Sequence, residues 1–251
     1  MSEAIRCDNL TIGYGTHVVQ SALMFSLNEG EMVCMLGPNG CGKSTLLRTL
    51  AGLQPPLGGT YRLLGVSSEK AGESSAERAK HLALVLTERL SLEHTTVHDV
   101  VAMGRYPYSS FLGGLSADDE AVIADALQQV GLQDMADTYF NNHSDGEKQR
   151  ILIAKALAQQ TPVILLDEPT AHLDLPNRIR TLQLLRHLAH EQGKTILIST
   201  HELDLALQLS DRILLMSDGG IQLDTAQALR ARNAFTAAFK MDIFHPLYAT
   251  P

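Results

Sequence analysis

The sequence has no tryptophan, few aromatic residues and no excess of basic residues. Aromatic residues make up 5% of the chain, and 20 Lys and Arg stand against 28 Asp and Glu, giving a net charge of −8 at pH 7. Non-specific nucleic-acid binding requires clustered cations, and binding of single strands also uses aromatic side chains on which bases stack. The composition therefore argues against nucleic acid as a partner.

Cysteines and long apolar runs are also scarce. Cys7, Cys34 and Cys41 are odd in number and none forms a CxxC pair, so we expect neither a disulfide framework nor a zinc cluster, and a reducing cytosol. The opening MSEAIRCDNL has no basic region followed by an apolar run, so we expect no signal peptide. No run approaches the roughly 18 apolar residues that span a bilayer, so we expect membrane contact only through a partner.

Short apolar runs alternate with helical patterns along the chain. Residues 1–36 favour strands, and a helical pattern from Lys43 stops at the QPPLGG breaker. PVILLD (162–167) and TILIS (195–199) are typical of strands buried on both faces, and the helical stretch between them ends at Gly193. This alternation predicts an α/β fold with a parallel sheet.

The stretch GPNGCGKST, which follows an apolar strand and opens a helix, fits the phosphate-loop pattern G-x-x-x-x-G-K-[ST]. Successive backbone N–H groups of such a loop wrap a triphosphate. We expect Lys43 to reach the β- and γ-phosphates and the Ser44 hydroxyl to bind Mg²⁺. The alternative is a glycine-rich turn with an incidental lysine. The predicted ATP-binding residues are Gly37, Pro38, Asn39, Gly40, Cys41, Gly42, Lys43, Ser44 and Thr45.

The stretch VILLDEPT places two acids at the end of a buried strand. Ligands of α/β sheets bind outside the carboxyl ends of the strands. We expect Asp167 to hold Mg²⁺ through water and Glu168 to polarise the attacking water. The alternative is that these two acids are simply solvated at the end of a strand. The phosphate loop elsewhere in the chain favours the functional interpretation over this alternative.

Together these motifs resemble the ATP-binding-cassette (ABC) family over nearly the whole chain. The resemblance implies a phosphate-loop NTPase with a parallel core sheet and an N-terminal antiparallel β subdomain. It also implies one ABC-type domain over residues 1–251, with a helical subdomain inserted at about 88–157. In this family two subunits pair head to tail around ATP, and hydrolysis drives a transporter. We therefore expect a homodimeric ATPase.

HSDGEKQR (143–150) lies where that family carries its leucine-serine-glycine-glycine-glutamine signature. The resemblance implies that Ser144 and the Gly146 backbone bind the γ-phosphate of the partner's ATP. Ser144 and Glu147 also have the spacing of a capping box, so a plain helix start is the alternative. Asp145 and Glu147 depart from the signature, and their charge should weaken closure unless Glu147 turns back to cap and Asp145 points to solvent.

Weaker matches complete the expected site. His201 resembles the family's switch histidine, which contacts the γ-phosphate, and a structural histidine is the alternative. Tyr14 resembles the aromatic residue that stacks on adenine, and a tyrosine that only packs in its strand is the alternative. Asp174 resembles a residue of the subunit contact, with a helix cap as the alternative. Thr87 aligns with the glutamine that senses Mg²⁺. Cys41 has features that favour a thiolate, although a small packing residue is the preferred interpretation.

The segment VVAMGRYPY (100–108) resembles the subgroup that imports iron–siderophore complexes, haem or cobalamin. We expect Arg105, Tyr106 and Tyr108 to face an integral-membrane permease, with an ordinary surface of the helical subdomain as the alternative. A substrate-binding protein would act indirectly, and the chain would work at the cytoplasmic face of the inner membrane. The alternatives are a non-transport ABC ATPase, which usually carries two cassettes in one chain, and a phosphate-loop kinase, which would not need HSDGE or His201.

Overall fold

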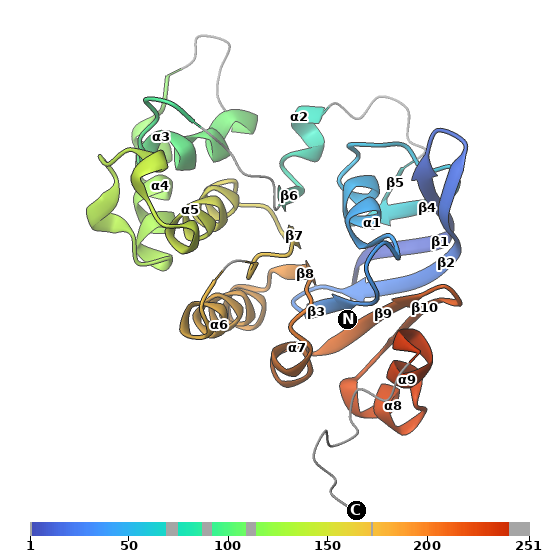
Figure 1. Cartoon of the computed structure of the whole chain (residues 1–251). Coiled ribbons are helices and arrows are strands. Elements are labelled where there is room, and N and C mark those ends of the chain that lie inside the picture. Colours follow the sequence, from blue (N-terminus) through green and yellow to red (C-terminus); the bar gives the residue numbers. More distant parts are fainter. Residues whose placement is uncertain (1, 69–74, 87–91, 109–113, 172, 241–251) are drawn as a thin grey trace, which may run out of the picture.

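The computed structural model describes residues 2–68, 75–86, 92–108, 114–171 and 173–240. Within them the chain forms two β-sheets and a group of helices that stands to one side (Figure 1). The predicted α/β class, with a parallel core sheet and an antiparallel sheet at the N-terminal end, is confirmed. No helix in these ranges combines the length and the apolar character that crossing a bilayer demands.

The antiparallel sheet has the strand order β2-β1-β4-β5, and its first two strands form a long hairpin. Leu10, Ile12 and Leu27 are buried on its inner face, while other positions are exposed, as in a sheet with one solvated face. The strands are β1 Glu3–Tyr14, β2 His17–Asn28, β4 Gly58–Leu63 and β5 Val66–Ser67.

The core sheet has the order β10-β9-β3-β8-β7-β6 and is parallel except for β10. Every residue of β3, β7 and β8 is buried, because other elements cover both faces of the sheet. The strands are β3 Met32–Leu36, β6 Leu82–Val85, β7 Val163–Asp167, β8 Thr195–Ser199, β9 Arg212–Ser217 and β10 Gly220–Asp224.

The core sheet separates two apolar cores. Alternate residues of β3 show this, since Cys34 belongs to the core shared with α6, whereas Val33 and Met35 belong to the core shared with α1 and the antiparallel sheet. The helices of this part are α1 Lys43–Leu50, α2 Ser75–Arg78, α6 Leu175–Gln192, α7 Leu203–Leu209, α8 Ala226–Ala231 and α9 Ala234–Phe239.

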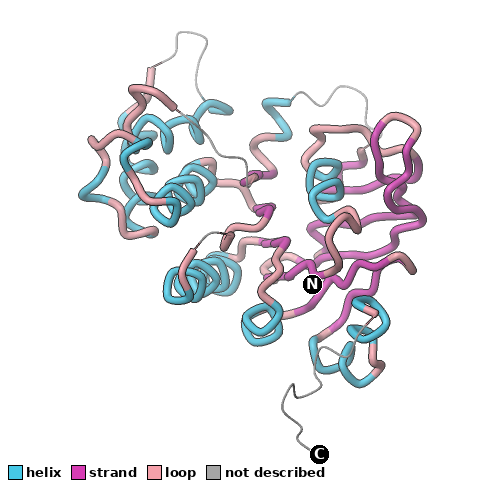
Figure 2. The backbone as a smooth tube through the Cα atoms, in the orientation of Figure 1, coloured by secondary structure: helices cyan, strands magenta, loops and turns pink. Residues whose placement is uncertain are grey.

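Between β6 and β7 the described residues 97–108 and 114–158 form a helical arm. In it α5 packs against α3 and α4, and Figure 2 shows these helices apart from the strands. Complete capping boxes start α3 at Thr96, α4 at Ser116 and α5 at Ser144. The elements are α3 Val97–Ala102, η1 Met103–Tyr108, α4 Ala117–Gln129, η2 Gln133–Met135, η3 Phe140–Asn142 and α5 Asp145–Ala158.

Candidate functional site

The loop between β3 and α1 needs glycine for steric reasons. A Cβ atom on Gly37 would lie 2.4 Å from the backbone oxygen of Met216, and one on Gly42 would lie 2.8 Å from Cγ1 of Val19. Gly40 has a φ of +77°, in the left-handed region. No side chain caps α1 at Gly42, so its first turn presents backbone N–H groups as an anion-binding helix start does.

Lys43 is buried and lies over this loop. Its Nζ donates to the backbone oxygens of Gly37 at 2.8 Å and Pro38 at 3.2 Å. Gln20, which the sequence analysis missed, donates from Nε2 to the backbone oxygens of Cys41 at 3.0 Å and of the last residue of β9 at 2.9 Å. These bonds tie the loop to the neighbouring strand, and a polar residue within the strand pattern of β2 was the available signal.

Three neighbouring parallel strands end at one edge of the sheet: β3 at the loop, β8 at Ser199 and β7 at Asp167. The Ser199 hydroxyl donates to Asp167 Oδ1 at 2.5 Å and accepts from the backbone N–H of Glu168 at 2.9 Å. These contacts help to hold Glu168 at a φ of +48°, which is unusual for a residue with a side chain. The carboxylate Oε1 of Glu168 lies 2.5 Å from Nε2 of His201. The structure thus groups Asp167, Glu168 and His201, and it adds Ser199.

The residues predicted to hold a metal supply hard oxygen donors, which suit Mg²⁺. Ser44 is exposed on the first turn of α1, and Asp167 ends β7, against which α1 packs. In the ranges that the structure describes, no three His, Cys, Asp or Glu side chains gather as a metal site. Thr87 lies outside the described residues.

The predicted signature forms the N-terminus of α5. The Ser144 hydroxyl accepts from the Glu147 N–H at 3.3 Å, and the Glu147 carboxylate accepts from the Ser144 N–H at 2.9 Å and hydroxyl at 2.8 Å. The Ser144 hydroxyl, and then its N–H, lower the pKa of Glu147. Asp145 is exposed. Both conditions under which we expected charge repulsion from the two acids to be limited are therefore met.

The structure does not bring the signature to the loop of its own chain. Figure 1 shows α5 in the helical arm, with β6 and β7 between it and α1. Asp174 is exposed and caps α6, accepting from the Asn177 N–H at 3.1 Å. Ser144 and Asp174 are thus both helix caps, as the alternative interpretations held, and roles for Ser144, Gly146 and Asp174 in a subunit contact stay predictions.

Two other predicted residues lie beside the loop. Tyr14 is half exposed, and its hydroxyl accepts from Thr45 Oγ1 at 3.1 Å. Cys41 is buried, and burial raises the pKa of its thiol, with only a partial offset from Lys43. The environment of Cys41 therefore favours the protonated thiol, in agreement with the packing interpretation.

The expectation that Arg105 faces a membrane partner is wrong. The side chain is buried and donates to Asp119 Oδ1 at 2.7 Å and to the Ala158 backbone oxygen at 2.7 Å. A guanidinium has several donors in a fixed geometry, and here they find acceptors inside the helical arm. Tyr106 and Tyr108, by contrast, are 66% and 40% exposed.

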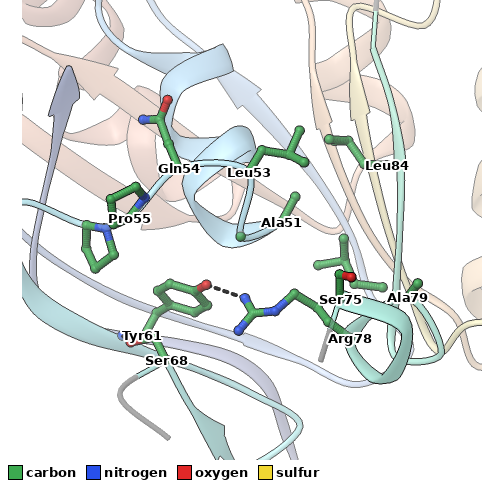
Figure 3. A pocket seen from close by; sticks show the side chains of 13 residues that line it. Ala51, Leu53, Gln54, Pro55, Tyr61, Ser68, Ser75, Arg78, Ala79 and Leu84 are labelled. Atoms are coloured by element: carbon green, nitrogen blue, oxygen red, sulfur yellow. Dashed lines mark hydrogen bonds between the residues drawn. The ribbon is translucent and has the colours of Figure 1, made fainter. Parts of the chain in front are cut away.

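A cavity of about 610 Å³ lies at the C-terminal end of α1, the end away from the phosphate loop (Figure 3). It is bordered by residues 51–56, by α2 and by β6. Across it Arg78 Nη1 donates to the Tyr61 hydroxyl at 2.5 Å. None of the predicted ATP-binding residues lines this cavity.

Comparisons with known proteins agree with this geometry. A family model described as ABC transporter matches residues 21–171. The iron(3+)-hydroxamate import ATP-binding protein of Bacillus subtilis is 35% identical, over 95% of this chain and 88% of that protein. The achromobactin transport ATP-binding protein of Dickeya dadantii is 40% identical, over 84% and 78%.

Solved structures match as well. A structure of an ABC transporter in an inward-facing conformation has a TM-score of 0.83 at 30% identity, covering 95% of this chain and 90% of that one. A dimeric bacterial ABC transporter cassette has a TM-score of 0.78 at 27% identity, covering 88% and 98%.

Proposed function

We propose, from the premise that this chain belongs to the ABC transporter family, that it is the motor subunit of an importer for iron–siderophore, haem or cobalamin complexes. As a member of that family it binds nucleotide and hydrolyses ATP. The observation that carries the motor role is the meeting of three strand ends, where one edge of the sheet bears the phosphate loop, the Asp167–Glu168 pair and His201.

The phosphate loop binds the triphosphate. Backbone N–H groups from Gly37 to Thr45 surround the phosphate oxygens, and the Lys43 ammonium, now held by two loop carbonyls, moves to the β- and γ-phosphates. Tyr14, placed beside the loop by its contact with Thr45, stacks on the adenine. Ser44, Asp167 and Thr87 would hold Mg²⁺, which would neutralise charge that develops on the phosphates.

Glu168 orients and polarises the attacking water. Its backbone is fixed by Ser199, and its carboxylate lies against His201, so both side chains are placed before nucleotide arrives. When ATP binds, His201 turns from Glu168 to the γ-phosphate. A water molecule then lies between a carboxylate and a phosphorus atom, as in-line attack requires.

Two copies complete each site. Ser144 and the Gly146 backbone at the start of α5 bind the γ-phosphate held by the partner, which places a helix N-terminus at an anion. Asp174 lies at the contact between the subunits. The exposure of Ser144 and Asp174 supports this arrangement, because an interface in trans needs accessible side chains.

The importer assignment comes from the relatives, which include ATP-binding proteins of hydroxamate import, achromobactin transport and cobalamin import. The permease is a separate membrane protein, a substrate-binding protein delivers the cargo to it, and the motor works at the cytoplasmic face of the membrane. We place permease contacts at the cavity beside Leu53, which is 63% exposed, and at Tyr106. A partner seated in the cavity would touch residues 51–56, which directly follow α1, and the other end of α1 adjoins the phosphate loop.

The test is purification of the chain with its membrane partner, followed by ATPase assays and an absorption spectrum of the bound cargo. Haem, ferric siderophores and cobalamins absorb differently, so the spectrum identifies the class. Labelled ATP should release free phosphate. Label transferred to a small-molecule acceptor, with no membrane partner recovered, would identify a kinase and refute the proposal.

A further inference from the structure

The segment η1 lies directly against the C-terminal end of α5. A Cβ atom on Gly104 would lie 2.3 Å from the Lys155 backbone oxygen, so only glycine permits this approach. Arg105 and Tyr108 follow on the same segment, and each donates to a backbone oxygen at the end of α5. Arg105 Nη1 donates to that of Ala158 at 2.7 Å, and the Tyr108 hydroxyl to that of Gln159 at 2.9 Å.

Arg105 connects η1 to α4 and to the end of α5 through one buried guanidinium. Besides Ala158, it donates to Asp119 Oδ1 on α4 at 2.7 Å and to Gln160 Oε1 at 2.9 Å, and it lies 4.2 Å from the ring centroid of Tyr108. This buried charge resists displacement, since losing Asp119, its carboxylate partner, would leave the guanidinium buried without a counter-charge.

The two glutamines after α5 point to opposite parts of the molecule. The side chain of Gln160 accepts from Arg105 in the arm. The side chain of Gln159 donates to the backbone oxygens of Ala79 at 2.5 Å and Leu82 at 3.0 Å, which belong to residues lining the cavity in Figure 3. Gln160 also has a φ of +54°, unusual for a residue with a side chain. The connection from α5 to β7 is therefore a joint between the arm and the core sheet.

We propose that Arg105 is the positioning residue of this joint: it fixes the direction in which α5 leaves the core, and thereby the place where Ser144 meets the partner's ATP. The inference rests on the proposed function of Ser144 in trans. Helix α5 has 14 residues, a length of about 21 Å, so a tilt of about 5° at the joint moves its far end by about 2 Å. An error of about 1 Å in a reacting group can cost about 100-fold in rate.

The test uses Arg105→Met, with Arg232→Met as the matched control, because Arg232 forms an exposed ion pair with Asp224. We expect Arg105→Met to bind a fluorescent ATP analogue as wild type does but to lose at least about tenfold in kcat, while the control keeps wild-type activity. Asp119→Asn removes the carboxylate that pairs with Arg105 while keeping the arginine. If Arg105→Met does not fold, this second variant carries the test and should show the same kcat loss.

Mixing the chains separates positioning from general stability. An excess of Glu168→Gln subunits, inactive themselves but with an intact arm, should restore hydrolysis at the loop of Arg105→Met. An excess of the double variant, Arg105→Met with Glu168→Gln, should not. Wild-type kcat in both single variants, or no rescue by Glu168→Gln, would overturn the inference.

A parallel titration tests the proposed function by itself. An excess of subunits that carry both Glu168→Gln and Ser144→Ala should lower the activity of wild-type subunits, since they offer each wild-type loop a defective signature. If this excess has no effect, the paired site is wrong. If it lowers wild-type activity and yet Glu168→Gln fails to rescue Arg105→Met, only the role of Arg105 is wrong.

Discussion

Glu147→Gln should strengthen the ATP-bound dimer. Ser144 has a single hydroxyl proton, and that proton is donated to the Glu147 carboxylate at 2.8 Å. The carboxylate is ionised, because its hydrogen bonds from Ser144 lower its pKa. A γ-phosphate that accepts a hydrogen bond from the Ser144 hydroxyl must therefore displace a charged acceptor. Through this competition Glu147 opposes closure of the dimer.

The magnitude follows from the two kinds of hydrogen bond. One to a charged group contributes about 1.5–3 kcal/mol and one between neutral groups about 0.5–1.5 kcal/mol, a difference of about 1 kcal/mol for each signature. A dimer has two signatures, so its free energy of association with ATP bound should become more favourable by about 2 kcal/mol. The dissociation constant of the ATP-bound dimer should then fall about 30-fold. The isolated chain should lose about 0.3–1 kcal/mol of stability, because a negative charge leaves the N-terminus of α5.

The assay is analytical ultracentrifugation with ATP in the Glu168→Gln background, with and without Glu147→Gln. The control is Glu120→Gln, since Glu120 lies in the first turn of α4 and pairs with His98 rather than with a cap. It should leave the dimer unchanged. A dimer that is weakened or unchanged by Glu147→Gln would refute the idea that Glu147 competes with the γ-phosphate for the Ser144 hydroxyl.

Three further predictions concern the loop and the arm. Lys43→Ala should weaken ATP binding by about 2–3 kcal/mol, roughly 30- to 150-fold by calorimetry, and wild-type affinity would contradict the role of its ammonium. Gly37→Ala should destabilise the fold by about 2 kcal/mol, lowering Tm by about 6 °C, because its Cβ meets a backbone oxygen at 2.4 Å; an unchanged Tm would contradict this. Hydrogen bonds from the Ser116 N–H, and then from Arg105, lower the pKa of Asp119 from 3.8 to about 2, so the stability it contributes is present above about pH 4 and is lost as pH falls towards 2. Denaturant titrations across this range should show a smaller acid dependence in Asp119→Asn than in wild type, and an equal dependence would contradict the assignment.

The sequence alone predicted those features of the site that depend on residues close together in the chain. The glycines of the loop, the strand ending at Asp167 and the capping box of Ser144 each depend on residues near one another in the chain, and each was predicted. Ser199 and Gln20 were missed because their partners come from other strands, 32 residues away for Asp167 and 197 residues away for the end of β9. Only the sheet order brings these groups together.

Arg105 shows why exposure is hard to infer from a short motif. Next to two tyrosines it was predicted to lie on a contact surface. Its acceptors at Ala158 and Gln160 lie 53 and 55 residues further along the chain, and they draw the guanidinium inward. The buried position follows from the packing of η1 on α5, which residues 100–108 alone do not encode.

The central claim is that each ATP lies between the loop of one subunit and the signature of another. Asn39 and Asp145 are exposed, whereas the native Cys7, Cys34 and Cys41 are buried, so single cysteines at positions 39 and 145 can be cross-linked selectively. In the Glu168→Gln background, a mixture of Asn39→Cys and Asp145→Cys chains treated with a short bismaleimide should form a covalent dimer with ATP and not without it. Absence of that dimer at ATP concentrations where the wild-type chain hydrolyses ATP would contradict the shared site.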